Sequence, residues 1–410
     1  MKKILFTLLI FIFTAGVAFA ESNFTIKGDF SVRGSHIKNE ELASTDAATY
    51  DYYDQDMNIY AKFIASKTTW ANLKIAINDE EWGTVEFGQF KDSDENIAIE
   101  RAYMTHVFPT HTVLVLGKMD GGTWGTAFGD DKEARYRVKV VQPLSPKAIL
   151  LGVIEKGGDV KIGQANTGEQ GYIDGGTKDA EKDDNDRYAV GAILTFGDFH
   201  VKPLYYMVKD SSACMDQSSN GMDVNIMFLA LDGKFGMFGF EAEYMSKDID
   251  TDPCAGGFSW TLPGMYVNVW ADLAPAKVGL IYADGGTDTN KGVEKAFDND
   301  DDFDLTLFLS DWVGFGGGDG LTGMNAIQVY GSYKFSDKMS ANASYTMVDS
   351  NWDAGDYKGA EATEMDFGLG YAITKNLTYS IAAGFASIDA EGSPDPEDGA
   401  RIYHKLKMKF

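Results

Sequence analysis

Cationic side chains recur at every second position in two segments of this sequence. Arg135, Arg137 and Lys139 do so within residues 133–142, and apolar or aromatic residues fill the positions between them. The last ten residues, 401–410, repeat this pattern. Because successive side chains on a strand point to opposite faces, each segment predicts a strand with one cationic and one apolar face. Such a strand suits a position with lipid on its apolar side and water on its cationic side; the alternative is an ordinary edge strand.

Residues that could catalyse a reaction or bind a metal form no recognisable set. Histidine supplies no ligand-spaced pair among His36, His106, His111, His200 and His404. The sequence has no His-Glu-x-x-His motif, no Gly-x-Ser-x-Gly motif and no phosphate-binding loop. Residues 248–259 begin like a calcium loop, but Pro253 replaces the required glycine and Ser259 stands where the bidentate glutamate belongs. We predict neither an enzyme nor a resident metal or cofactor.

The first twenty residues predict a cleaved secretory signal peptide. Lys2 and Lys3 precede an apolar run over residues 4–13, and Ala18-Phe19-Ala20 forms a small-x-small cleavage site. The mature domain is therefore predicted to be 21–410. It has no apolar run of the ~20 residues that a membrane-spanning helix needs. If this domain enters a membrane, it must do so as a closed barrel, because only helices and closed barrels satisfy every backbone group in lipid.

The composition suits long paired strands. The formal charge is −26, which argues against nucleic acid as a partner. Aromatic residues make up 13% of the chain, and 45 glycines accompany only 9 prolines. A disordered acidic chain would lack these aromatics, so we expect a folded β protein.

Short apolar/polar alternations predict eighteen strands, with sixteen as the alternative. Eight tight turns alternate with nine longer segments rich in Gly, Asp and Asn, so both chain ends fall on the side of the tight turns. Bacterial barrels have short periplasmic turns, long outer loops and an even number of strands. The expected strands are 24–34, 54–66, 70–79, 96–108, 111–119, 133–142, 147–156, 186–197, 199–209, 222–232, 235–247, 264–273, 276–284, 325–335, 339–349, 363–373, 376–388 and 401–410.

Two features fit this pattern less well. Pro203 lies within an expected strand, where it removes a backbone donor and predicts a bulge. Phe303 to Trp312 looks strand-like but falls in an expected loop, so we expect it to fold inward or to cap that loop. The fold class that follows is an all-β transmembrane antiparallel barrel.

Alternation along the strands assigns side chains to the interior of the barrel. Since the last strand pairs with the first in a closed barrel, one side of the interior should be basic and the opposite side acidic. Glu364 and Asp366 add to the acidic side, and Arg401, Lys405, Lys407 and Lys409 to the basic side. Opposed charges would create a transverse field that favours polar solutes; the alternative is that they only keep the interior wet. The predicted pore-lining residues are Lys27, Arg33, Lys62, Lys74, Asp120, Asp130, Asp131, Arg135, Arg137, Lys139, Glu241 and Glu243.

Residues 97–106 continue through Pro109 into 113–118, then Gly121-Gly122-Thr123-Trp124-Gly125 and the basic segment 134–139. This run resembles the homotrimeric outer-membrane porins of sulfate-reducing and related anaerobic bacteria, and Gram-negative porins more broadly. The resemblance covers residues 50–160 and the last strand. It implies a homotrimer of water-filled barrels in the outer membrane, with a loop over Asp120–Asp131 folded into the interior and with the terminal Phe410 recognised by the barrel-assembly machinery.

The long loops carry two further features. Cys214 and Cys254 lie in neighbouring expected outer loops and are candidates for a disulfide; in an anaerobe they could equally be two reduced thiols. Residues 179–186, 298–302 and 391–398 are strongly acidic. These stretches could bind divalent cations that bridge to lipopolysaccharide, or form a solvated, repelling surface.

The function expected first is an outer-membrane porin for passive diffusion of small hydrophilic solutes and ions. The alternatives are a channel selective for an organic acid, an oxyanion or a sugar, and a surface structural barrel whose interior is plugged. The sequence does not choose among the solutes.

Overall fold

The structure is a computed structural model that describes most of the chain. The described residues are 24–39, 49–82, 97–121, 124–129, 134–158, 185–210, 222–251, 257–297, 303–310, 322–353, 358–389 and 398–410. The predicted signal peptide lies outside them. Among the described residues, no helix is long and apolar enough to cross a membrane.

Eighteen strands form one antiparallel sheet, and two short strands form a separate hairpin. The hairpin is β14 (Thr287–Asn290) with β15 (Val293–Ala296). The sheet consists of β1 (Phe24–Lys38), β2 (Thr49–Ser66), β3 (Thr69–Glu81), β4 (Ile97–Val107), β5 (Val113–Met119), β6 (Arg135–Ser145), β7 (Ala148–Gly158), β8 (Asn185–Phe196), β9 (Phe199–Asp210), β10 (Met222–Phe235), β11 (Phe238–Thr251), β12 (Ser259–Leu273), β13 (Ala276–Gly285), β16 (Met324–Lys334), β17 (Met339–Ser350), β18 (Glu361–Thr374), β19 (Leu377–Asp389) and β20 (Gly399–Lys409).

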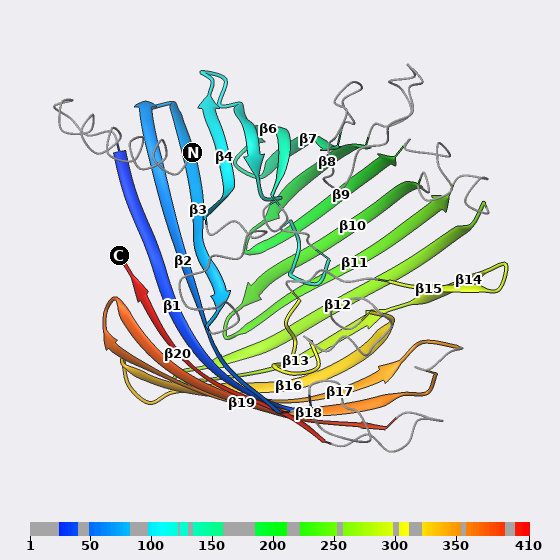
Figure 1. Ribbon diagram of the computed structural model, residues 1–410. Helices are drawn as coiled ribbons and strands as arrows, with labels where there is room; N and C mark the ends of the chain where they lie inside the picture. The colour runs from blue at the N-terminus through cyan, green and yellow to red at the C-terminus, as the bar shows by residue number, and fades with distance from the viewer. Residues whose placement is uncertain are drawn as a thin grey trace, which may run out of the picture.

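The sheet closes on itself. Each strand pairs with its neighbours in sequence, β13 pairs with β16, and β1 pairs with β20 from Asp29↔Lys409 to Lys38↔Ala400. Figure 1 shows β1 and β20 side by side, with the C-terminus at the end of β20. Closure leaves no unpaired sheet edge, which is the condition for a sheet to cross lipid.

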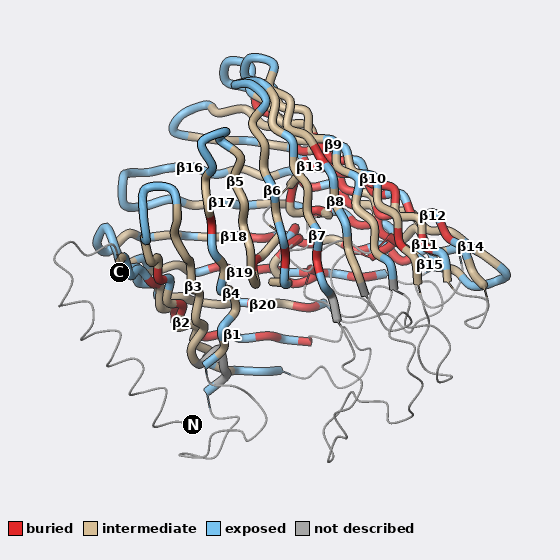
Figure 2. Tube along the Cα trace, turned by 90° about the horizontal axis from the view of Figure 1, so that it is seen from above, coloured by how far each residue is buried: buried red, intermediate tan, exposed pale blue. Residues whose placement is uncertain are grey.

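The two faces of the barrel differ as the alternation predicts. Turns are exposed, whereas buried positions gather along the strands from β10 to β13 and from β16 to β19 (Figure 2). The outward face is apolar and exposed, as lipid contact requires. Its members include Ile26, Ile99, Met104, Val138, Ile154, Val190, Met227, Leu229, Val269, Leu280, Val329, Met347, Phe367, Ile381 and Leu406.

The predicted eighteen-stranded barrel is confirmed, and sixteen strands are excluded. Most predicted boundaries fall within three residues of those observed; β2 and β12 begin five residues earlier than expected. The hairpin β14–β15 was not predicted. It turns at Lys291 and Gly292, which both have positive φ (51° and 77°), a backbone geometry that twists a two-residue hairpin in the favoured sense.

The bulge expected at Pro203 is wrong. Pro203 pairs in register with Leu229 of β10. On its other side the ladder with β8 keeps one register from Gly191↔Leu204 to Leu194↔Val201 and only lacks the pairs between them. The missing N–H is therefore accommodated without an inserted residue.

The seam between β1 and β20 is completed by the terminal residue. Gly28 and Phe410 exchange two backbone hydrogen bonds, each of 2.9 Å from N to O. The ring of Phe410 covers Gly28, so a Cβ at that position would collide with the ring and with the backbone oxygen of Asn58.

We expect Gly28→Val to destabilise the barrel by about 1–3 kcal/mol, because the added side chain overpacks the seam. Gly152→Val on β7 is the matched control, since nothing lies within 4 Å of its Cβ position. Urea unfolding of both variants in detergent, followed by tryptophan fluorescence, measures the difference. Equal stability of the two variants would contradict the role of this contact.

Candidate functional site: the interior of the barrel

Two loop segments lie inside the barrel. The first inward segment, residues 124–129, belongs to the connection between β5 and β6. The second inward segment, residues 303–310, belongs to the connection between β15 and β16. The inward fold expected for the loop over Asp120–Asp131 is therefore confirmed for its described part, as is the inward alternative for Phe303–Trp312.

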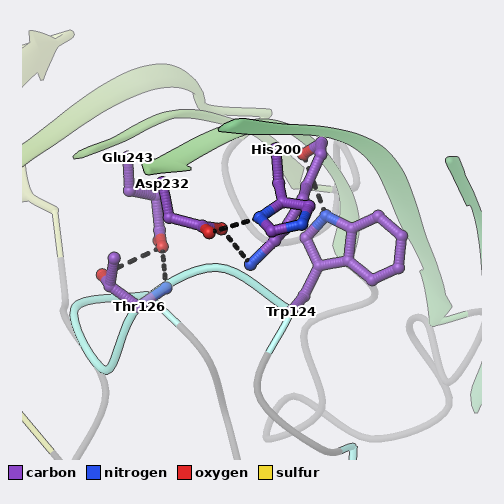
Figure 3. A network of polar contacts seen from close by, with 6 residues as sticks. Trp124, Thr126, His200, Asp232 and Glu243 are labelled. Carbon is purple, nitrogen blue, oxygen red and sulfur yellow. Dashed lines mark hydrogen bonds and ion pairs between the residues drawn. The ribbon is translucent and has the colours of Figure 1, made fainter. Parts of the chain in front are cut away.

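Glu243 of β11 holds the first inward segment. Its Oε2 accepts hydrogen bonds from the backbone N–H of Thr126 at 2.5 Å and from the Thr126 hydroxyl at 3.0 Å (Figure 3). The indole N–H of Trp124 donates to the backbone oxygen of Lys202 at 3.0 Å. Gly125 permits the close approach, because a Cβ there would overlap the Glu243 carboxyl group.

Glu364 of β18 holds the second inward segment in a similar way. Its two oxygens accept the backbone N–H groups of Phe308 and Leu309, each at 2.8 Å. Leu309 is fully buried. A carboxyl group with both oxygens engaged by adjacent N–H groups fixes the position and the direction of the turn.

Two further wall residues brace the same segment through its carbonyl groups. Arg401 of β20 donates from Nη1 to the oxygen of Leu307 at 3.2 Å. Gln328 of β16 donates from Nε2 to the oxygen of Leu305 at 2.5 Å. The segment is thus bonded to three strands, so its backbone polar groups are satisfied inside the barrel.

The two segments meet in an aromatic cluster. The rings of Phe128 and Phe303, one from each segment, lie edge to face with centroids 5.2 Å apart. Phe128 also stacks on Phe297 at 5.3 Å, and Tyr266 of β12 contacts both Phe128 and Phe303 at 5.9 and 5.6 Å. Gly264 leaves space for Phe297, whose ring would overlap a Cβ at that position.

The basic side of the interior surrounds the β20–β1 seam. Arg33 lies directly across the strand pair from Lys405 and forms an ion pair with Asp54, with 2.7 Å between Nε and Oδ2. Lys62 lies over the ring of Trp70 at 4.5 Å. Among the described residues, Lys27 and Lys405 have no ion-pair partner. Other cations of this wall are paired, namely Lys74 with Glu100, Arg101 with Asp120 and Lys407 with Asp29.

The three cations of β6, Arg135, Arg137 and Lys139, all have polar partners in the protein. Arg137 is buried and forms an ion pair with Glu155 of β7, with 2.7 Å between Nε and Oε1. It also donates from Nη1 to the oxygen of Met119 at 3.2 Å. Lys139 approaches the oxygen of Gly121 at 3.4 Å, and Arg135 lies 4.0 Å from Glu155. These side chains hold the start of the loop that leads to the first inward segment.

The expectation that all four acidic residues lie opposite the basic side is wrong for Glu364 and Asp366, because their strand β18 is separated from β20 only by β19. The acidic residues are also engaged in hydrogen bonds. Glu241 accepts hydrogen bonds from the Tyr266 hydroxyl at 3.1 Å and the Asn268 amide at 3.0 Å. Asp366 accepts from the Ser344 hydroxyl at 3.1 Å. With Glu243 and Glu364 holding the inward segments, these acidic residues act mainly as a scaffold. The transverse field remains a prediction.

A cavity of about 370 Å³ lies beside the first inward segment, lined by Thr126, Lys202, Asp232, Glu241 and Trp270 among others. Asp232 pairs with His200 at 2.7 Å and with Lys202 at 2.5 Å (Figure 3). A volume of this size accommodates a small organic solute.

Sequence reasoning missed the partners of the interior cations. Glu155, Asp54 and Asp232 were not assigned, although each lies across a strand pair from a cation, as in Arg137↔Glu155. Opposite charges at directly facing positions are a cross-strand signal, but reading it requires the register.

Several predicted residues lie outside the described part of the chain. They are Asp130, Asp131, Cys214, Cys254 and most of the acidic stretches 179–186, 298–302 and 391–398. Within the described residues, no cluster of His, Cys, Asp and Glu could hold a metal ion.

The arrangement is that of a closed β-barrel with an interior narrowed by two loops. No family model matches the sequence. No curated protein matches it either. Among solved structures, the chain is similar to the outer membrane protein OpdK from Pseudomonas aeruginosa, with a TM-score of 0.58 and 11% identity over 94% of this chain and 98% of that one. It is similar to OccAB3 of Acinetobacter baumannii, with a TM-score of 0.57 and 12% identity over 94% and 99% of the two chains.

OpdK has also been solved with vanillate, and that structure has a TM-score of 0.58 at 12% identity over 94% of this chain and 98% of that one. A likeness at this identity establishes the fold. The outer-membrane location expected from the signal peptide and the last strand agrees with that of OpdK, an outer membrane protein with the same fold.

We expect Glu155→Ala to destabilise the barrel by up to about 3–5 kcal/mol, because it leaves the buried Arg137 guanidinium without its counter-charge. The control is Asp337→Ala, which breaks an exposed pair with Lys334 at 3.2 Å and should cost at most about 1 kcal/mol. Urea unfolding in detergent compares the two. Similar small losses would show that Arg137 is well solvated.

Proposed function

We propose that the protein is an outer-membrane channel that selectively passes small hydrophilic anions, carboxylates foremost. The observation that carries the proposal is the basic wall inside a closed barrel, which includes Arg33, Lys62, Lys27 and Lys405. Cations that line a water-filled passage attract anions and lower the cost of removing them from bulk water.

The inward segments support selectivity over unrestricted diffusion. They fill part of the interior with aromatic and hydrogen-bonded groups, which leaves a passage bordered by charged side chains and aromatic rings. A carboxylate with an apolar or aromatic body matches both surfaces, because its charge can meet the lysines while its body contacts rings such as Trp70. The solved OpdK structure with vanillate, an aromatic carboxylate, supports the same class of solute.

Two other functions remain as outcomes of the test. General diffusion, as in a porin, requires only that the interior hold water. A plugged structural barrel is favoured by one observation, the burial of the second inward segment, in which Leu309 is fully and Phe308 nearly buried.

The test is single-channel recording of the purified protein in planar bilayers, with vanillate as the probe solute and glucose at the same concentration as the comparison. The proposal predicts discrete conductance steps and a block of the current by vanillate that glucose does not produce. Steps without differential block would indicate general diffusion. The absence of steps would indicate a plugged barrel.

Neutralising the unpaired cations of the basic wall should change ion selectivity. We expect Lys27→Gln with Lys405→Gln to shift the reversal potential in a salt gradient towards cation selectivity, since two positive charges leave the passage. Lys338→Gln, in the exposed turn between β16 and β17, serves as the control and should leave the reversal potential unchanged. Equal reversal potentials for all forms would refute a role for the basic wall.

We further propose that the barrel assembles as a homotrimer in contact with outer-membrane lipid and lipopolysaccharide, and that Phe410 serves in recognition by the assembly machinery. Support comes from the porin resemblance of residues 50–160 and of the last strand. Native mass spectrometry in detergent should then give three times the mass of the mature chain. A single-chain mass under conditions that keep the barrel folded would contradict the trimer.

A further inference from the structure

We infer that the two inward segments form one coupled body, which Glu243 of β11 and Glu364 of β18 position from two separate strands of the wall. The first inward segment is held by Glu243 and the second by Glu364, and the two segments touch through Phe128 and Phe303. The role of this body in setting the width of the passage rests on the channel function proposed above, whereas the coupling itself does not.

The Glu243 contact is a hydrogen bond to backbone in a closed environment. Glu243 is buried, and its Oε2 accepts both the N–H and the hydroxyl of Thr126. A buried donor that loses its acceptor bears the full cost of desolvation. The segment would therefore leave the wall far more often without this carboxyl group.

Glu364, at a distant point of the chain, also holds a loop by accepting hydrogen bonds from its backbone N–H groups. Glu364 is buried, and it accepts the adjacent N–H groups of Phe308 and Leu309. Within the turn, Thr306 and Ser310 also exchange hydrogen bonds, each N–H to the other's hydroxyl at 3.0 Å. The turn is thus a preformed unit that Glu364 holds at its end.

The aromatic cluster connects the two units. Phe128 of the first segment contacts Phe303 of the second, and both rings contact Tyr266 of the wall. Phe297 is fully buried against Phe128. Interlocked rings in a dense cluster cannot shift singly without leaving a void, so a movement of one segment should loosen the other.

The test is hydrogen–deuterium exchange of the folded, detergent-solubilised protein, read at the amides of Thr126, Phe308 and Leu309. In Glu243→Ala, exchange at Thr126 should rise roughly 5- to 100-fold, as expected for the loss of a buried acceptor. Coupling predicts that exchange at Phe308 and Leu309 rises severalfold in the same variant. Glu364→Ala should give the reciprocal result.

Two variants separate coupling from general loosening. Asp54→Ala also removes a hydrogen-bonded interior carboxyl group, bonded to Arg33 at 2.7 Å. Among the described residues, Asp54 contacts neither segment, so all three amides should exchange as in the wild type. In Phe128→Leu, the ring contacts are lost, and Glu243→Ala added to it should no longer affect Phe308 and Leu309. Glu243→Gln, which keeps one acceptor oxygen, provides a milder form should the alanine variant not fold.

Exchange at Phe308 and Leu309 that does not respond to Glu243→Ala, while Thr126 responds, would overturn the inference and show two independent loops. In bilayers, either alanine variant should give noisier and larger open currents than the wild type. If the wild type passes no current at all, the channel proposal fails, and the exchange data still decide whether the segments are coupled.

Discussion

The requirement that every backbone N–H and C=O be satisfied in lipid governs this molecule. A sheet meets it only when its first and last strands pair, and here β1 and β20 do so along ten residue pairs. The terminal Phe410 extends that seam by bonding to Gly28. Once the sheet is closed, alternation along each strand turns one set of side chains to lipid and the other to the interior.

The same requirement applies to the loops that enter the interior. The second inward segment has no strand partner, so its N–H and C=O groups are satisfied by side chains of the wall, chiefly Glu364, Gln328 and Arg401. The first inward segment relies on Glu243 in the same way. Acidic residues on β11 and β18 therefore serve to hold backbone, whereas Lys27 and Lys405 near the β1–β20 seam have no ion-pair partner among the described residues.

The alternation of apolar and polar residues with a period of two was the sequence signal that predicted most of the fold. It identified all eighteen strands, because the alternation of side chains along a strand follows from local geometry. It did not give the hairpin β14–β15, whose strands are only four residues each. The bulge predicted at Pro203 is absent, because a proline can pair in register where its missing N–H faces a gap in the hydrogen-bonded ladder.

The interior was less predictable for a physical reason. Whether Arg137 faces open water or Glu155 depends on strand register. Whether Glu243 lines the passage or holds Thr126 depends on the position of a loop 117 residues earlier in the chain. Neither is encoded in the local sequence pattern. The likeness to OpdK and OccAB3 fixes the fold but not these contacts, at 11% and 12% identity.

The most direct test of the account is solute entry into proteoliposomes, measured by swelling rate with a monocarboxylate and with an uncharged sugar of similar size. The account predicts that the carboxylate enters faster and that the advantage shrinks as salt concentration rises, because screening weakens the basic wall. Equal rates for the two solutes at low salt, or no swelling with either, would contradict it.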